Sequence, residues 1–465
     1  MSYQRLVLLL LMLAYAFNSM DRSIISIVGQ SLKADLQLSD TELGLLGGTA
    51  FAMLYALGGL PIARLAERAS RVNILSIAMF LWSSLTALCG VAGSFLQLLL
   101  IRMGVGVAES ACSPPAHSLI SDYVEPRRRA SALSVYSVGL SLGYILAAAV
   151  GGYVTQHLGW RAACLLVGLP GIVMAGLIKG LVREPRRAGA LGPAPAFSLR
   201  GELSELAAVT RVLFGQAAVM HMLLGITIGA FAAYGFYAFT PVYFIRRFGL
   251  DYTTVGLVSA FAGGVAVAFG ILAGGFVADS LARHHRRWYA LVPAIGGAIS
   301  LPLYAAGVLA PGWMAATLLL ALAGFFQYGL LGPTFGVVQN VVGPHRRATA
   351  TALLYILLNV VALGGGPLFV GAVIDRAAEA QFAQPSGSPP ASPGLSYRSS
   401  CPGGRAAHGP PAADLRCRDT LAQATRAGLL ASLLFFGWAA LHYALAARGI
   451  ARALALSAPP SEPPR

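Results

Sequence analysis

The chain has 465 residues, of which 57% are hydrophobic and only 11% charged, whereas soluble domains carry about 25% charged residues. The net charge of +15 lies in short arginine groups between long apolar runs. That distribution is typical of the loops of a membrane protein and argues against nucleic-acid binding. No segment remains for a soluble catalytic domain.

Twelve apolar segments are long enough to cross a membrane as helices, since roughly 20 apolar residues span the hydrocarbon core. Ser39-Asp40-Thr41-Glu42 predicts a capping box at the start of the second segment. In chain order the segments cover residues 4–31, 42–63, 72–94, 96–123, 130–157, 161–181, 214–246, 252–279, 288–310, 313–341, 348–375 and 425–448. The pattern predicts an all-α membrane protein.

The arginine groups fall in every second loop, and the positive-inside rule places those loops and both termini in the cytoplasm. The expected location is a bacterial inner (plasma) membrane. The predicted domains are a six-helix half (1–181), a cytoplasmic linker (182–213), a second six-helix half (214–450) with a long external loop (377–424), and a cytoplasmic tail (451–465). Because residues 380–420 are rich in Pro, Ser, Gly and Ala, we expect that part of the loop to be mobile.

Cys401 and Cys417 both lie in the external loop. They either form a disulfide, which an oxidising compartment would preserve, or remain two free thiols, and the sequence leaves both options open. His117 and His221 stand alone within spans, without the spacing of a metal site. The chain also lacks a phosphate-binding loop. We therefore expect neither a metal nor a cofactor.

Two short patterns occur twice in the chain. Ala63, Glu67 and Arg71 follow one another at intervals of four residues, and so do Gly275, Asp279 and Arg283. The run Pro126-Arg127-Arg128-Arg129-Ala130 likewise returns as Pro344-His345-Arg346-Arg347-Ala348. A parallel repeat in an apolar chain indicates two halves related by an axis along the membrane normal, which is the layout of a secondary transporter.

Together these features resemble the major facilitator superfamily over essentially the whole chain. Its loops after the second and eighth helices carry a Gly-x-x-x-Asp-Arg-x-Gly-Arg type signature. The second copy here keeps Gly275, Asp279 and Arg283, whereas the first has Ala63 and Glu67 in place of the glycine and the aspartate. The resemblance implies the twelve-helix major facilitator fold and transport by alternating access.

Within that family, the chain is most similar to the spinster branch. The matching motifs are Met20-Asp21-Arg22, Pro61-Ile62-Ala63-Arg64-Leu65-Ala66-Glu67-Arg68 and Arg102-Met103-Gly104-Val105-Gly106-Val107-Ala108-Glu109, followed by Pro114-Pro115. Members of this branch are proton-linked or facilitative carriers, and the animal ones export lysolipids or sphingoid phosphates. The resemblance therefore implies a lipid-like or amphiphilic substrate class, without naming the substrate.

Charged residues inside spans are costly and usually functional. At 1.5 Å per residue, Asp21 lies ~22 Å along the first span, and Arg102 lies ~10 Å from the opposite start of the fourth. Glu109 lies two turns beyond Arg102 on the same face, near the midplane. We predict that Asp21, Arg102 and Glu109 converge on a cavity for protons or substrate. A fixed ion pair that only locks the two spans is the alternative.

In this mechanism Arg102 pairs with Asp21, Glu109 or an anionic substrate, and protonation of a carboxylate releases it. Arg22 either joins the cavity or points to the interface. The second half has no buried charge in this interpretation, and a cavity with one polar and one apolar wall suits an amphiphile. The other predicted lining residues are Tyr234, Tyr237, Gln327, Tyr328, Tyr355 and Asn359, although the aromatics of span seven also fit an interfacial belt.

A cytoplasmic gate is predicted at the repeated loop motif. Its carboxylates can cap helix ends and pair with arginines across the two halves. The arginines at 127–129 and 346–347 are the candidate partners, and a solvated basic loop that only sets topology is the alternative. The predicted gate residues are Glu67, Arg68, Arg71, Asp279 and Arg283.

The sequence thus predicts a secondary active transporter, not an enzyme, that moves an amphiphilic, anionic organic solute or lysolipid and is proton-coupled or facilitative. A multidrug or organic-anion carrier is the alternative. An intramembrane lipid-modifying enzyme is less favoured, because the sequence shows no clustered nucleophile and base. The expected partners are a small-molecule or lipid-like substrate, protons and membrane lipids, and the expected state is a monomer.

Overall fold

The computed structural model describes residues 3–125, 128–185, 199–342, 346–383, 396–408 and 410–456. Within these ranges the chain is helical, and ten helices are long and apolar enough to cross a membrane. Helix α7 (Arg129–Leu181) contains two spans that are divided at Gly159, where φ is +83° and a side chain would be strained. A further span consists of α2 (Asp40–Gly44), the π-helical turn η1 (Leu45–Thr49) and α3 (Ala50–Arg68). The prediction of an all-α membrane protein with twelve spans is confirmed.

The spans are often broken into shorter helices. The other elements are α1 (Tyr3–Leu36), α4 (Arg71–Cys89), α5 (Phe95–Glu109), α6 (Ser113–Tyr123), α8 (Leu199–Phe214), α9 (Ala217–Phe248), α10 (Tyr252–Ser259), η3 (Ala260–Val265), α11 (Ala266–Ala282), α12 (Trp288–Leu309), α13 (Trp313–Tyr328), α14 (Leu331–Val341), α15 (Arg347–Ile356), η5 (Leu357–Leu363), α16 (Gly364–Phe382), α17 (Tyr397–Ser400), η6 (Pro402–Gly404), α18 (Pro411–Ala446) and α19 (Ile450–Leu456).

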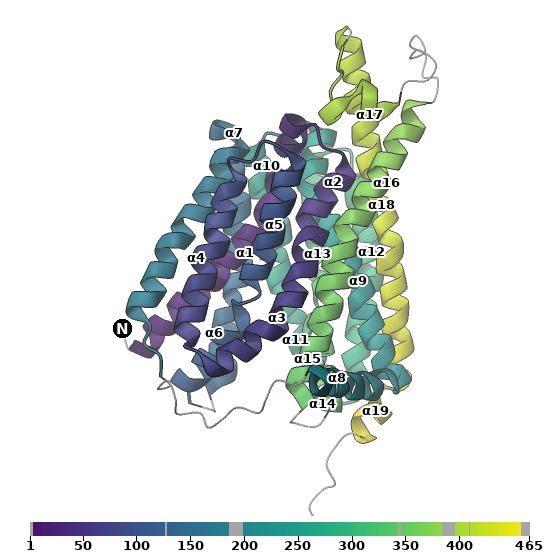
Figure 1. The fold of residues 1–465 in the computed structure, drawn as a ribbon. Coiled ribbons are helices and arrows are strands. Elements are labelled where there is room, and N and C mark those ends of the chain that lie inside the picture. The colour runs from purple at the N-terminus through teal and green to yellow at the C-terminus, as the bar shows by residue number, and fades with distance from the viewer. Residues whose placement is uncertain are drawn as a thin grey trace, which may run out of the picture. The chain divides into compact units, whose positions relative to one another are not determined.

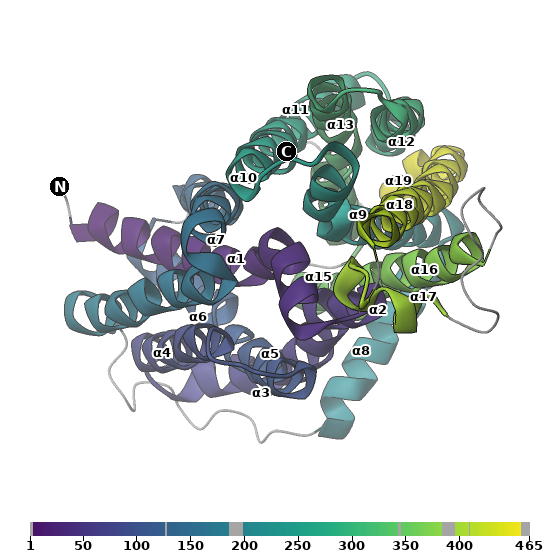
Figure 2. The same ribbon diagram turned by 90° about the horizontal axis from the view of Figure 1, so that it is seen from above.

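These helices form two compact units. The first contains Met1–Pro195, Tyr234–Val265 and Leu363–Leu429, and the second contains Ala196–Ala233, Ala266–Ala362 and Leu430–Arg465. In the first unit α7 packs along α1 and α4, and α2 packs against α16 (Figures 1 and 2). In the second, α13 packs against α11 and α12, and α8 lies beside α15 (Figure 1). The first unit therefore combines the first six spans with segments from much later in the chain.

Helices α2 and α16 approach each other closely because glycines face the contact. A Cβ atom on Gly44 would lie 2.3 Å from the carbonyl oxygen of Pro367, and one on Gly371 would lie 2.2 Å from that of Asp40. Small residues let membrane helices bring their backbones together in this way. The predicted capping box is also confirmed, because the Ser39 hydroxyl accepts from the Glu42 N–H and the Glu42 carboxylate accepts from the Ser39 N–H.

The structure differs from the sequence prediction in the external loop and the linker. Helix α16 continues to Phe382, α17 forms a short turn, and α18 already begins at Pro411, so much of the expected mobile loop is helical. Cys401 and Cys417 form a disulfide that fixes this region. In the predicted linker, α8 forms because Val209 and Leu213 are buried in the core of the second unit.

Two names describe the ends of the first unit. The end that carries the Cys401–Cys417 bond and the start of α2 is called the disulfide end. The end where α4 begins, at Arg71, is called the arginine end.

Candidate functional site

Four charged side chains from α1 and α5 come together inside the first unit. Asp21 and Arg22 are neighbours on α1, and Arg102 and Glu109 lie on α5. Asp21, Arg102 and Glu109 are at most 1% exposed, whereas the Arg22 side chain is 25% exposed. Arg102 therefore binds its partners out of contact with water, where ionic hydrogen bonds are strong, whereas the guanidinium of Arg22 stays partly accessible.

The pairing within this site differs from the expected one. The Nε atom of Arg22 donates to the Glu109 carboxylate at 2.7 Å. Arg102 instead donates to the backbone carbonyl of Asp21 at 3.1 Å and, at 3.5 Å, to that of Leu46. Because Arg102 and Glu109 are seven residues, about 10 Å, apart along α5, Arg22 reaches the carboxylate that Arg102 does not. Arg22 thus points into the site and not toward an interface.

Each carboxylate of the site has a buried oxygen without a hydrogen bond of ordinary geometry from the described residues. These oxygens are Asp21 Oδ2 and Glu109 Oε1. A buried polar atom without a partner is costly, and such atoms are often places where a water, proton or ligand binds. These two oxygens are therefore candidate positions for a water, a proton or a ligand.

Two aromatic rings flank Arg22. The guanidinium carbon of Arg22 lies 4.6 Å from the ring centre of Tyr55 and 4.9 Å from that of Phe51. Cations are attracted to ring faces at this distance. The rings hold the guanidinium in place and give its surroundings an apolar character.

The predicted lining residues divide between the two units. Tyr234 and Tyr237 of α9 belong to the first unit, where the Tyr234 side chain is 38% exposed. Gln327, Tyr328, Tyr355 and Asn359 belong to the second. There, Gln327 is buried and accepts a hydrogen bond from Ser300 at 2.8 Å. The Asn359 amide donates to the Tyr355 carbonyl oxygen at 2.8 Å, while the Tyr355 residue is 50% exposed, and Tyr328 is half-buried.

Of the predicted gate residues, Arg71 has the most extensive contacts. Its side chain is 1% exposed and forms ion pairs with Asp122 at 2.7 Å and Glu184 at 2.6 Å, all within the first unit. Burial raises the pKa of Glu184, but hydrogen bonds from Arg71 and the Val72 N–H outweigh burial, so that this pKa lies below its ordinary value. Arg71 thus joins helix ends within one unit.

The other gate residues have fewer described contacts. Asp279 and Arg283 are exposed around the end of α11, and the side chains of Glu67 and Arg68 lie outside the described part of the structure. Arg346, a candidate partner for the gate, pairs with Glu205 of α8 at 2.8 Å within the second unit. Arg127, another candidate partner, lies outside the described residues.

A second charged cluster, at the disulfide end of the first unit, was missed by the sequence analysis. Asp40 pairs with Lys33 at 2.9 Å and with Arg246 at 2.7 Å. Asp375 of α16 accepts from the backbone N–H groups of Asp40 at 2.9 Å and Thr41 at 2.8 Å. We call Lys33, Asp40, Arg246 and Asp375 the disulfide-end cluster.

Arg246 belongs to the predicted second half, residues 214–450, although it packs in the first unit. The cluster therefore overturns the expectation that this half has no buried charge. The side chain of Arg246 is only 3% exposed, and it also donates to Gln30 at 2.7 Å and to Thr425 at 2.8 Å. Its partner Asp40 is fully buried as well.

The sequence suggested that His221 stands alone, but the structure places a second histidine beside it. The Nδ1 atom of His221 lies 2.8 Å from Nδ1 of His442, which α18 contributes within the second unit. The two residues are 221 positions apart in the chain, so the sequence gives no sign that they pair.

Comparisons with known proteins place the fold and the site in context. A family model described as "Major Facilitator Superfamily" matches residues 11–367. The chain belongs to the Major Facilitator Superfamily. Its relatives in this superfamily include an "MFS-type efflux pump" of Mycolicibacterium smegmatis, 30% identical over 81% of this chain and 86% of the relative. Another is a "Hexuronate transporter" of Bacillus subtilis, 26% identical over 80% of this chain and 88% of the relative.

A solved member of the superfamily superposes closely. It is a bacterial homologue of the human lysosomal transporter Spinster, in an inward-facing and unoccupied conformation. The two chains are 30% identical, with a TM-score of 0.84 over 97% of this chain and 98% of that one. This chain is therefore a spinster-like secondary transporter, as its motifs at Asp21 and Glu109 predicted, and it is not an enzyme.

Proposed function

We propose that this transporter moves an amphiphilic organic anion and couples its movement to a proton at Glu109. The observation that carries the proposal is the 2.7 Å pair between the fully buried Glu109 and the partly exposed Arg22. A substrate carboxylate or phosphate can bind the exposed side of the guanidinium and compete with Glu109 for it. Glu109 then binds a proton, because a buried carboxylate without its cation is costly. When the substrate leaves, the proton is released and the pair forms again.

The other site residues have supporting roles in this proposal. Arg102 holds the backbones of α1 and η1 in place through its two carbonyl contacts. Asp21, whose Oδ2 atom receives no hydrogen bond of ordinary geometry from the described residues, is a second place for the proton. The rings of Phe51 and Tyr55 give the substrate an apolar surface beside the positive charge, and this combination suits an amphiphile.

The relatives support an anionic substrate without naming it, since hexuronates carry a carboxylate. A lysolipid with an anionic head group also combines a negative charge with an apolar chain, and the spinster-like character supports that class. The alternative is a multidrug or organic-anion carrier, which the likeness to an efflux pump favours. We further propose that the protein is a monomer whose gate includes Glu67, Arg68, Arg71, Asp279 and Arg283.

We propose that the disulfide end faces the periplasm and the arginine end the cytoplasm of a bacterial inner membrane. Disulfides persist in oxidising compartments, and arginine-rich loops stay in the cytoplasm. Both termini are then cytoplasmic, with residues 1–181 and 214–450 as the two halves and residues 182–213 as the linker between them.

The test is transport by purified protein in liposomes that contain a pH-sensitive dye. Hexuronates, aromatic carboxylates, lysolipids and a set of cationic and neutral drugs are each added outside to the wild type, Glu109→Gln and Asp21→Asn, and uptake of the labelled compound is measured together with the dye signal. Asp251→Asn, which changes an exposed carboxylate, is the matched control. We expect substrate-dependent proton movement that falls at least about tenfold in Glu109→Gln and persists in the control.

Each other result has a definite meaning. Unchanged proton movement in both Glu109→Gln and Asp21→Asn would show that these carboxylates are structural. Substrate flux without any proton movement would contradict the coupling but not the transport. Equal flux of many unrelated cations and neutral drugs would favour the multidrug alternative.

A further inference from the structure

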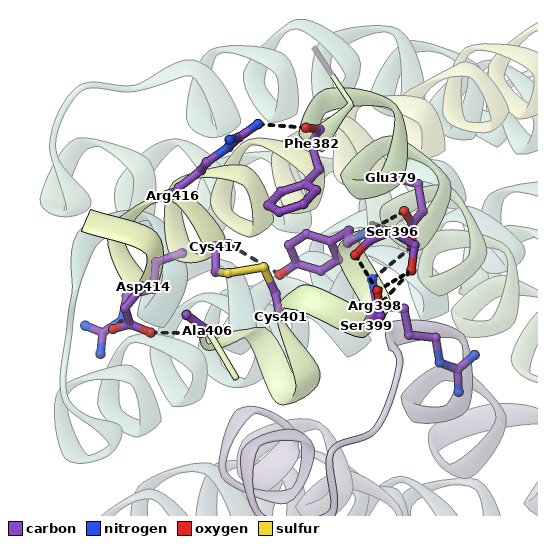
Figure 3. The surroundings of a disulfide bond; sticks show 12 residues. Glu379, Phe382, Ser396, Arg398, Ser399, Cys401, Ala406, Asp414, Arg416 and Cys417 are labelled. Atoms are coloured by element: carbon purple, nitrogen blue, oxygen red, sulfur yellow. Dashed lines mark hydrogen bonds and ion pairs between the residues drawn. A yellow bond between two sulfur atoms is a disulfide. The ribbon is translucent and has the colours of Figure 1, made fainter. Parts of the chain in front are cut away.

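Residues 396–408, which precede α18, are attached to both α16 and α18. We call these residues the strap. The disulfide joins Cys401 of the strap to Cys417 in α18, and both sulfur-bearing residues are 2% exposed (Figure 3). On the other side, the Glu379 carboxylate of α16 accepts from the backbone N–H groups of Tyr397 at 2.7 Å and Arg398 at 3.0 Å (Figure 3). The strap is thus attached to α16 and α18.

The strap rests on the end of α1. Gly403 and Gly404 have φ values of +64° and +89°, which favour glycine. A Cβ atom on Gly403 would lie 3.1 Å from the carbonyl oxygen of Lys33 and 3.2 Å from Ala34. Arg398 also reaches Glu42 of α2 at 3.4 Å, although its side chain is 71% exposed and this pair contributes little. The backbone contact with α1 is therefore the important one.

This contact lies next to the disulfide-end cluster. Lys33, on whose carbonyl oxygen the strap rests, is the residue that pairs with Asp40 through its side chain. Asp375, which binds the start of α2, lies one turn before Glu379 on α16. Any movement that separates α1 and α2 from α16 and α18 must break both the cluster and the contact of the strap.

We propose that the strap is a latch that holds the disulfide end closed, and that the disulfide keeps the strap in the conformation that contacts α1. The proposal rests on the proposed alternating access, in which this end must open. Elements as short as α17 and η6 do not keep their shape alone, and the bond, which closes a separation of 16 residues, keeps the two glycines against α1. Without it the strap leaves α1, and the closed arrangement loses part of its stabilisation.

The experiment is amide hydrogen exchange, read by mass spectrometry, on the full chain in lipid nanodiscs. The first variant is Cys401→Ser with Cys417→Ser. The second, Gly403→Ala, keeps the disulfide but disturbs the contact with α1. Gly249→Ala is its matched control, because Gly249 has a φ of +66° and nothing lies within 4 Å of its added Cβ atom.

We expect residues 33–45, which are outside the strap, to exchange at least about threefold faster in both test variants, because the end opens more often. Exchange in α4 stays unchanged, and the control resembles the wild type. If only residues 396–417 exchange faster, the bond stabilises the loop alone and the latch is disproved. The measurement needs no substrate. Faster exchange without any flux in the liposome assay would therefore support the latch while contradicting the transport proposal.

Discussion

The disulfide-end cluster and the site between α1 and α5 both combine two carboxylates with two basic side chains, but their hydrogen bonding differs. In the disulfide-end cluster, both oxygens of Asp40 and both oxygens of Asp375 have donors. In the site between α1 and α5, no hydrogen bond of ordinary geometry from the described residues reaches Asp21 Oδ2 or Glu109 Oε1. The first arrangement is complete without a ligand, whereas the second has places left for a proton or a substrate.

We call the disulfide-end cluster a lock, because it holds helices together, and the site between α1 and α5 an exchange site, because its carboxylates can exchange a cation for a proton. Arg246 is almost fully buried, and water cannot replace Asp40 when that partner is lost. Arg22 is 25% exposed, and water or an anion can take the place of Glu109. Breaking a buried pair leaves an uncompensated charge, which costs far more than the net contribution of the pair itself. Substitutions in the two clusters should therefore differ in their cost to stability.

The largest effect is expected for Asp40→Asn. The change leaves Lys33 and Arg246 buried without an anion, so we expect the free energy of unfolding to fall by about 3–5 kcal/mol. Thermal unfolding in detergent, followed by tryptophan fluorescence, measures this loss. Asp251→Asn is the control, because asparagine also caps a helix and its effect should be close to zero. Equal unfolding temperatures for the two variants would contradict the lock.

The next effect is the pH dependence of the ion pair at the arginine end, between Arg71 and Glu184. Against the effect of burial, hydrogen bonds from Arg71 and the Val72 N–H hold the pKa of Glu184 below its ordinary value of 4.5, so the contribution of this pair is fully present above that value. It is lost as the pH falls through the folded-state pKa. The gap in unfolding temperature between the wild type and Glu184→Gln should be constant at neutral pH and close below 4.5. A gap that widens on acidification would reverse the sign and refute the assignment.

The sequence predicted one cluster and missed the other for a physical reason. Asp21 and Glu109 interrupt long apolar runs, where any charge is rare and noticeable. Lys33 and Arg246 lie near the ends of spans, where charges usually face water. The bond between Arg246 and Asp40 also joins residues 206 positions apart, and only the folded chain brings them together. The twelve spans were predictable because length and hydropathy are local properties, whereas the pairing of Arg22 with Glu109 depends on how α1 and α5 pack.

A smaller loss is expected for Glu109→Gln, which makes the same kind of replacement in the open site. The amide oxygen still accepts from Arg22, and water reaches the guanidinium, so the loss should be about 1–2 kcal/mol. The same unfolding assay compares it directly with Asp40→Asn. A loss as large as that of Asp40→Asn would mean that the pair only locks α1 to α5, and the proposed proton exchange at Glu109 would lose its basis.

The smallest effect is expected at a third ion pair, between Arg161 and Asp35, in which each side chain is 44% exposed. Arg161 also lies over the Trp160 ring at 4.3 Å, and Asp35 accepts from the Trp160 indole N–H at 3.2 Å. Because water solvates both ions when the pair is broken, Arg161→Ala should cost about 0–1 kcal/mol, and less at high salt. The unfolding temperature at low and high ionic strength measures both. If Arg161→Ala costs as much as Asp40→Asn, exposure to water is not what distinguishes these pairs. The contrast between lock and exchange site would then need another cause.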